Sequence, residues 1–112
     1  MNEEIEAVTF YWRPGCGFCN RLHRSLTSLE VPLDMHNIWD EPEAAATVRS
    51  VANGNETVPT VVVGNTSMVN PTPAQVMAAL TDQAPHLVPV GYEPPQPTKI
   101  TKTLNRVLGG QT

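Results

Sequence analysis

The pattern of apolar and polar positions predicts a strand, a helix and a second strand at the start of the chain. Residues 7–12 are rich in β-branched and aromatic side chains, which predicts a buried strand. After Gly17 the apolar residues recur every three or four positions, which predicts a helix that buries this face. They are Phe18, Leu22, Leu26 and Leu29. Residues 33–39 alternate loosely between apolar and polar side chains and predict the second strand.

Four further elements follow in the next part of the chain. Asp40 is expected to cap a helix whose first turn holds Pro42. A β-branched run at 60–63 and a returning strand at 67–69 are separated by a two-residue hairpin turn. Thr72 is expected to cap the last helix of this region.

This order of elements predicts an α/β fold. A strand–helix–strand start implies a parallel pair, and the later hairpin adds an antiparallel edge. Three helices on a four-stranded mixed sheet form the thioredoxin-like architecture, which we expect to cover residues 1–84. Residues 85–112 form a proline-rich extension, with prolines at 85, 89, 94, 95 and 97.

The end of this extension has its own apolar pattern. Its apolar residues fall at helical spacing and predict a short C-terminal helix. They are Ile100, Leu104, Val107 and Leu108. Docking of this helix on its own domain is the simplest interpretation; a disordered tail or an adaptor helix that binds a partner are the alternatives.

Length and charge narrow the class of protein. A chain of 112 residues suggests one domain that buries a core without metal or disulfide support. The formal net charge of -4 argues against a nucleic-acid partner. The N-terminus lacks the basic start and apolar core of a signal peptide, and we find no membrane-spanning stretch. We therefore expect a cytoplasmic monomer without a membrane partner.

The two cysteines, Cys16 and Cys19, are the main candidate for chemistry. Residues three apart at the start of a helix lie on the same face, at a separation that permits a disulfide. The first of them faces the free N–H groups and the positive end of the helix dipole, which stabilises a thiolate. We therefore predict that Cys16 is the nucleophile and that Cys19, deeper along the helix, is the resolving thiol.

Other interpretations of this pair are weaker. A structural zinc site usually needs four ligands, and this chain offers one pair with His23 one turn beyond it. An inert structural disulfide is disfavoured because so short a loop constrains little chain. An iron–sulfur or metal carrier is the remaining alternative of a different class. We expect no metal, and surface or packing roles for His23, His36 and His86.

A second signal is Thr57-Val58-Pro59, which lies between a predicted helix and a predicted strand. If Pro59 is cis, the preceding backbone presents polar groups toward the cysteines, where a substrate chain can pair with them. The alternative is an ordinary proline that begins a strand.

Together these segments resemble the glutaredoxin family over about residues 7–84. Residues 11–19, Tyr-Trp-Arg-Pro-Gly-Cys-Gly-Phe-Cys, look like the family's strand end and dithiol, and Thr57-Val58-Pro59 looks like its cis-proline segment. The likeness is greatest to mycoredoxins, actinobacterial members with a Cys-Gly-aromatic-Cys site. Asn70-Pro71-Thr72, at the start of the last helix, is also similar to them. Mycoredoxins usually carry Trp just before the first cysteine, where this chain has Gly15.

The resemblance implies roles for particular residues. Arg13 stands where glutaredoxins often have a Lys that favours the thiolate. Thr57, Val58 and Pro59 would hold the backbone of a thiol cofactor, and Asn70 and Thr72 would meet its polar end. Asn70-Pro71 replaces the Gly-Gly usual in glutathione-using members, which favours mycothiol over glutathione.

The resemblance therefore implies an enzyme that reduces mixed disulfides between proteins and a small thiol. Its partners would be oxidised protein substrates and an upstream reductant, either mycothiol with mycothiol disulfide reductase or thioredoxin reductase. The second reductant would make it a protein disulfide reductase of the NrdH-redoxin type.

Overall fold

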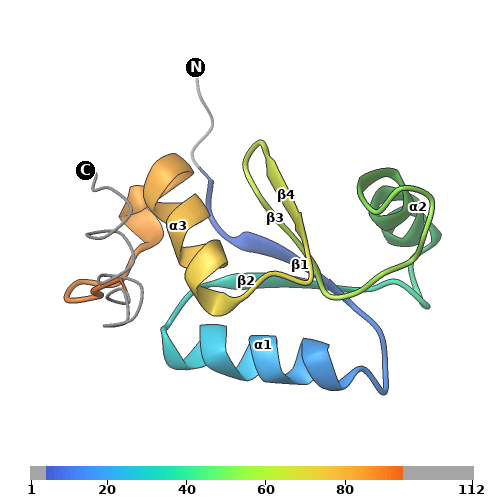
Figure 1. Cartoon of the computed structure of the whole chain (residues 1–112), viewed down its shortest axis with the longest axis horizontal. Coiled ribbons are helices and arrows are strands. Elements are labelled where there is room, and N and C mark those ends of the chain that lie inside the picture. Colours follow the sequence, from blue (N-terminus) through green and yellow to red (C-terminus); the bar gives the residue numbers. More distant parts are fainter. Residues whose placement is uncertain (1–4, 95–112) are drawn as a thin grey trace, which may run out of the picture.

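A computed structural model of the chain describes residues 5–94 and confirms the predicted order of elements (Figure 1). The elements are β1 (Val8–Trp12), α1 (Gly17–Ser28), β2 (Leu33–Asn37), α2 (Pro42–Val51), β3 (Thr60–Val63), β4 (Thr66–Val69) and α3 (Pro73–Gln83). A short 3-10 helix, η1 (Pro85–Leu87), follows α3. The predicted helix at 100–108 lies outside the described residues. In the described part of the chain no helix is both long and apolar enough to cross a membrane.

The four strands form one mixed sheet in the order β2-β1-β3-β4. Strands β1 and β2 are parallel, with Val8 opposite Leu33, because helix α1 returns the chain to the same end of the sheet. Strand β3 is antiparallel to both β1 and β4. This is the thioredoxin-like topology that the pattern of elements predicts.

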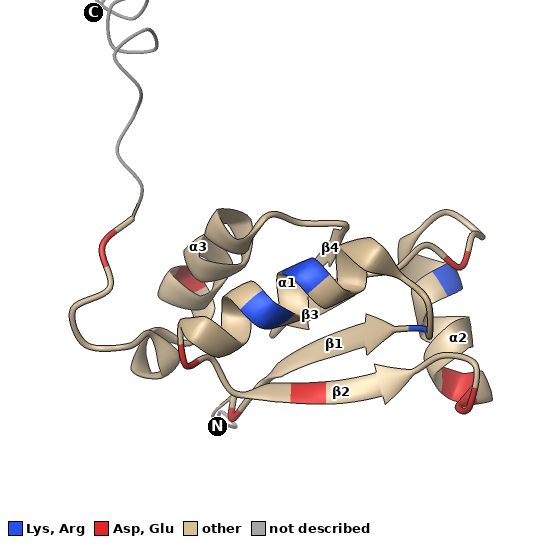
Figure 2. Ribbon diagram, turned by 90° about the horizontal axis from the view of Figure 1, so that it is seen from below, with Lys and Arg blue, Asp and Glu red and all other residues tan. Residues whose placement is uncertain are grey.

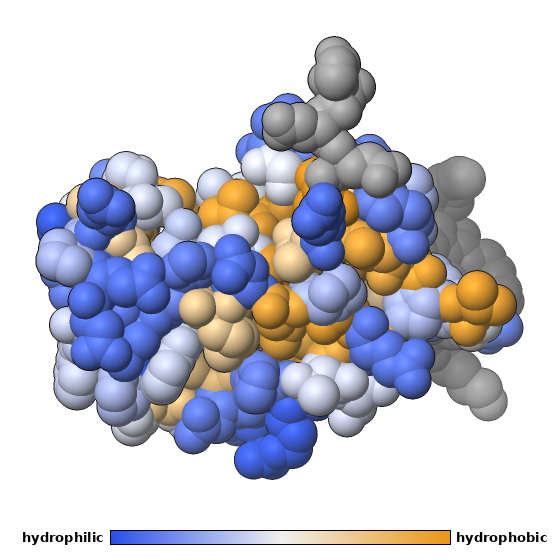
Figure 3. All heavy atoms as spheres, turned by 180° about the vertical axis from the view of Figure 1, so that it is seen from behind, coloured by the Kyte–Doolittle hydropathy of each residue, from blue (hydrophilic) through white to orange (hydrophobic). Residues whose placement is uncertain are grey.

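The core lies between the sheet and the helices. Val8, Phe10 and Val61 from the sheet and Leu26 and Leu80 from α1 and α3 are fully buried in one cluster. Helix α1 contacts α3, and Figures 1 and 2 show α2 at the opposite end of the sheet from α3. Figure 3 shows that on the far face the α2 end is hydrophilic, whereas apolar side chains gather over the middle of the molecule and toward the other end.

The predicted buried face of α1 is wrong at Phe18. Its side chain is 59% exposed, and the buried positions of the helix are Cys19, Leu22 and Leu26. At about 100° per residue, Phe18 lies about 80° around the helix axis from Leu26. Cys19 takes the inward position instead, as a small apolar side chain.

The predicted cap of α2 is also wrong, although Pro42 lies in the first turn as expected. Strand β2 ends at Asn37, two residues earlier than expected, because the Asn37 side chain accepts the Trp39 N–H at 2.9 Å and forms a turn. The helix then begins after Glu41, which makes no side-chain cap. Asp40 accepts a hydrogen bond from Asn37 Nδ2 at 3.2 Å and does not cap the helix.

The start of α3 follows the prediction. Thr72 accepts the Gln75 N–H at 3.1 Å, and the Gln75 side chain accepts the Thr72 N–H at 2.8 Å, which completes a capping box. Gln83, at the other end of α3, bonds to Thr66 Oγ1 and accepts the Asn65 N–H. The helix is thereby attached to the hairpin as well as to the core.

Candidate active site

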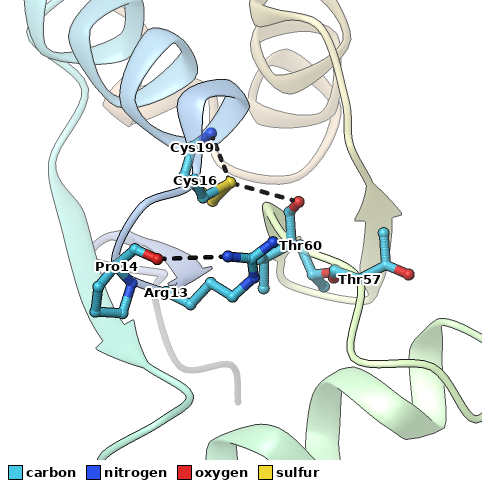
Figure 4. Close-up of a disulfide and its surroundings, with 7 residues drawn as sticks. Arg13, Pro14, Cys16, Cys19, Thr57 and Thr60 are labelled. Atoms are coloured by element: carbon cyan, nitrogen blue, oxygen red, sulfur yellow. Dashed lines mark hydrogen bonds between the residues drawn. A yellow bond between two sulfur atoms is a disulfide. The ribbon is translucent and has the colours of Figure 1, made fainter.

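The two cysteines lie where strand β1 gives way to helix α1, and they form a disulfide with a Cα–Cα distance of 5.2 Å. Cys16 is the N-cap of α1, and its Sγ accepts the backbone N–H of Cys19 at 3.1 Å (Figure 4). Cys16 is 6% exposed and Cys19 is 2% exposed. The predicted geometry is confirmed: a free N–H of the first turn points at the Cys16 sulfur, and Cys19 is the more shielded of the two.

A short turn brings Cys16 to this position. Gly15 has a φ of 80°, a left-handed conformation that side chains with a Cβ rarely adopt. Apart from its two chain neighbours, no atom of the described residues lies within 4 Å of the place where a Cβ would stand, so the backbone angle and not crowding explains the glycine.

The segment that precedes β3 packs against the disulfide. The Val58-Pro59 peptide bond is cis, and the Val58 carbonyl oxygen lies 3.7 Å from Cys16 Sγ. In the disulfide this is a contact only, because the sulfur carries no proton; a reduced Cys16 thiol can donate to the same oxygen. Thr57 is exposed, and its carbonyl accepts the hydroxyl of buried Thr60 at 2.8 Å.

Arg13 lies close in sequence to the cysteines but bonds elsewhere. Its guanidinium donates to the Pro14 carbonyl at 3.4 Å and lies 5.9 Å from the centre of the Trp39 ring, a cation–π arrangement. Among the described residues there is no hydrogen bond between Arg13 and Cys16. Any effect of Arg13 on a thiolate would act through the field of its charge.

A groove of about 340 Å³ runs between α1 and the start of α3. Its lining includes Phe18, Arg21, Ser25, Asn70 and Thr72. The Asn70 backbone N–H donates to the Pro59 carbonyl at 2.7 Å, so the groove is joined directly to the segment that contacts Cys16. The structure thus brings the predicted residues Asn70 and Thr72 together with the helix that carries the cysteines.

Sequence reasoning missed the α1 side of this groove. The Arg21 guanidinium lies 4.9 Å from the centre of the Phe18 ring. The signal was present, because residues three apart on a helix are neighbours and an aromatic residue next to an arginine can form such a pair. The α1 sequence has basic but no acidic residues, and Figure 2 shows this basic side of the helix in blue.

The described residues contain no group of three or more His, Cys, Asp or Glu side chains that could hold a metal ion. What the site can do follows from the dithiol itself. A dithiol in this position can exchange with a disulfide, because a thiolate can attack a disulfide sulfur and the two cysteines are close enough to form a disulfide with each other.

Comparison with known proteins agrees with this chemistry. The Glutaredoxin family model matches residues 8–68, more than half of the chain. Two Mycobacterium tuberculosis proteins, from strains H37Rv and CDC 1551 and each bearing the name "Putative glutaredoxin", are 40% identical to it over 75 residues. The match covers 66% of this chain and 89% of each relative.

Solved structures show the same fold. The glutaredoxin-like NrdH-redoxin from Escherichia coli, which has a thioredoxin-like activity profile, is 30% identical with a TM-score of 0.50. The match covers 57% of this chain and 82% of that protein. A glutaredoxin from Archaeoglobus fulgidus has a TM-score of 0.56 at 20% identity, over 65% of this chain and 84% of its own. With the Cys16–Cys19 pair at the start of α1, these matches establish that the chain belongs to the glutaredoxin family of thiol oxidoreductases.

Proposed function

We propose that this protein reduces mixed disulfides between proteins and a small thiol, and that the small thiol is mycothiol. The observation that carries the proposal is the position of Cys16 as N-cap of α1, with the Cys19 N–H directed at its sulfur. Such a position favours the thiolate, which is the form that attacks disulfides.

The reaction has two exchange steps. The Cys16 thiolate attacks the mycothiol sulfur of the mixed disulfide, a new bond forms between these two sulfurs, and the protein substrate leaves as a thiolate. A second mycothiol thiolate then attacks the mycothiol sulfur and releases mycothiol disulfide and the Cys16 thiolate. Alternatively Cys19 attacks Cys16, which releases mycothiol and gives the disulfide present in this structure.

The groove between α1 and α3 is the proposed site for the non-reacting part of the thiol. It begins at Phe18, between the two cysteines, and its polar groups include Arg21, Asn70 and Thr72. These groups suit a sugar-containing thiol, because hydroxyl and amide groups both donate and accept hydrogen bonds and the guanidinium donates them to hydroxyl oxygens. Thr57, Val58 and Pro59 are proposed to contact the cysteinyl end of the thiol beside Cys16.

A second candidate function differs in the source of electrons. The similarity to the Escherichia coli NrdH-redoxin favours a protein disulfide reductase that uses both cysteines and is reduced directly by thioredoxin reductase. Both candidates are reductive and suit a monomer in the cytoplasm.

The test measures turnover of one peptide as a mixed disulfide with mycothiol or with glutathione, each with its own reductase and NADPH. We expect preference for the mycothiol adduct. Cys16→Ser should lower turnover by about 10³-fold or more, because a hydroxyl is a far weaker nucleophile, whereas Cys19→Ser should retain most of it.

Two results would change the assignment. Equal loss in Cys16→Ser and Cys19→Ser would replace the single-thiol cycle with a dithiol cycle. Absence of turnover with either small thiol, together with rapid reduction by thioredoxin reductase and NADPH, would assign the protein to the NrdH-redoxin type.

A further inference from the structure

A second pocket, of about 240 Å³, lies between α1 and the strands β1 and β2. It is lined by Phe10, Trp12, Cys19, Asn20, His23 and Met35. Phe10 and Met35 are paired across the parallel strands, so they face the same side of the sheet as α1. Cys19 lines this pocket, and the pocket shares no lining residue with the groove between α1 and α3.

Cys19 must lose a proton before it can attack Cys16, since the thiolate is the attacking form. Burial opposes this step, because Cys19 is 2% exposed and a thiolate is poorly solvated there. Apart from Cys19, His23 is the pocket-lining residue whose side chain has a ring nitrogen that can accept a proton. It stands four residues after Cys19 on α1 and hence on the same side of the helix.

His23 is exposed on α1, and its ring contacts one wall of the pocket. Its centroid lies 6.1 Å from that of Phe10 in an edge-to-face arrangement. The side chains that β1 and β2 present to the pocket are apolar. The charged residue next to His23 on α1 is Arg24, and the two line a third pocket on the outer side of this helix. Asp34 and His36 of β2 alternate with Met35 and so lie on the other face of the sheet.

We propose that His23 accepts the proton of Cys19 during closure of the disulfide. The Cys19 thiol gives its proton to the imidazole, and its sulfur forms the bond to Cys16 Sγ. The bond between Cys16 Sγ and the small thiol or substrate breaks, and that group leaves as a thiolate with the electron pair. In reduction the imidazolium returns the proton to Cys19. This role rests on the dithiol chemistry of the family and not on the choice of mycothiol.

The experiment mixes the reduced protein rapidly with an aromatic disulfide, dithiobis(nitrobenzoate), that releases a coloured thiolate. The first release reports attack by Cys16, and the second reports attack by Cys19 on the resulting adduct. In His23→Gln we expect the second release to slow by at least about 10-fold at pH 7. This loss is smaller than the rate enhancement of about 10²- to 10⁴-fold that a general base typically gives. The first release should be unchanged.

Two further readouts separate proton transfer from a structural role. The dependence of the second release on pH should differ between His23→Gln and the unchanged protein, because the variant lacks the imidazole that accepts the proton. In His23→Ala, added imidazole should restore the second release in proportion to its concentration. His86→Gln is the matched control, because the His86 ring bonds to the Ile5 carbonyl and does not line the pocket.

An unchanged rate and pH profile of the second release in His23→Gln would overturn the proposal, as would equal slowing of both releases. Because the aromatic disulfide needs no small-thiol cofactor, failure here is distinguishable from failure of the mycothiol assignment.

Discussion

The dithiol and the groove between α1 and α3 differ in how their atoms are held. At the dithiol both sulfurs are buried, and Cys16 is held by a backbone N–H and by the turn at Gly15. At the groove the functional groups belong to exposed side chains, among them Phe18 and Asn70. The first region depends on the backbone of one short segment, whereas the second depends on side chains from α1 and from the segment that leads into α3.

This difference teaches which properties can change independently. Backbone groups stay in place when surface residues vary, so a chain that keeps the two cysteines, the strand, the turn and the helix keeps the geometry of the dithiol. Exposed groove residues can change without loss of the fold, because most surface substitutions alter stability by less than about 0.5 kcal/mol. In the proposed function, the choice of small thiol can therefore vary while the dithiol stays the same.

The first way to sharpen the comparison is to truncate one residue on the buried side of α1 and one on its exposed side. Leu26→Ala should lower the free energy of unfolding by about 2–5 kcal/mol, because Leu26 is fully buried and its loss leaves a cavity. Phe18→Ala should cost less than about 1 kcal/mol, because its ring is 59% exposed. Urea unfolding measures both, and similar losses in the two variants would contradict the division of the helix into a buried and an exposed side.

Particular residues show how far sequence could predict this molecule. The place of the cysteines at the start of a helix and the order of elements follow from local spacing, because a helix start and a strand are defined by neighbours in the chain. The same local logic predicted Thr72 as a cap, which the capping box confirms. It failed at Phe18, because the helical period alone does not say which of two adjacent faces meets the sheet.

Only one side of the groove could be predicted from the sequence, and the reason differs from that at Phe18. Asn70 meets the Pro59 carbonyl through a hydrogen bond that closes only when β3 and β4 have paired. No spacing in the sequence encodes that contact, or the approach of Arg21 to the same groove. Asn70 and Thr72 were proposed from the family resemblance, whereas Phe18 and Arg21 required the packing of two helices.

A second way to test the comparison is to remove one polar group from the groove while keeping the backbone. Asn70 has a φ of 52°, so Asn70→Gly removes the side chain without adding strain. We expect KM for the mycothiol adduct to rise about 3- to 10-fold, the loss of one hydrogen bond of about 1 kcal/mol, with kcat nearly unchanged.

The matched control for this variant is Asn53→Gly. Asn53 has a φ of 61° at the end of α2 and does not line the groove. It should leave KM unchanged. A similar rise in both variants, or a fall in kcat for Asn70→Gly alone, would mean that the groove and the dithiol are not separable.

The smallest expected effect concerns His36, on the sheet face opposite α1. Its Nδ1 lies 2.7 Å from Glu41 Oε1 and its Nε2 lies 3.1 Å from Asp34 Oδ2, so the imidazolium donates to a carboxylate on each side. The bond to Glu41 is the main cause that raises the pKa of His36 above 6.5, with burial acting in the opposite direction. The folded protein therefore binds this proton more tightly than the unfolded chain does.

It follows that His36 contributes stability that is complete below pH 6.5 and is lost as pH rises through its raised pKa. The urea midpoint should fall over this interval, and His36→Gln should remove that part of the fall. The change should be below about 1 kcal/mol, because partly exposed ion pairs contribute little. The first release, which reports attack by Cys16, should keep its pH profile in His36→Gln. A shifted profile would show that the reactivity of the dithiol depends on the β2–α2 turn, and would contradict the view that His36 affects stability alone.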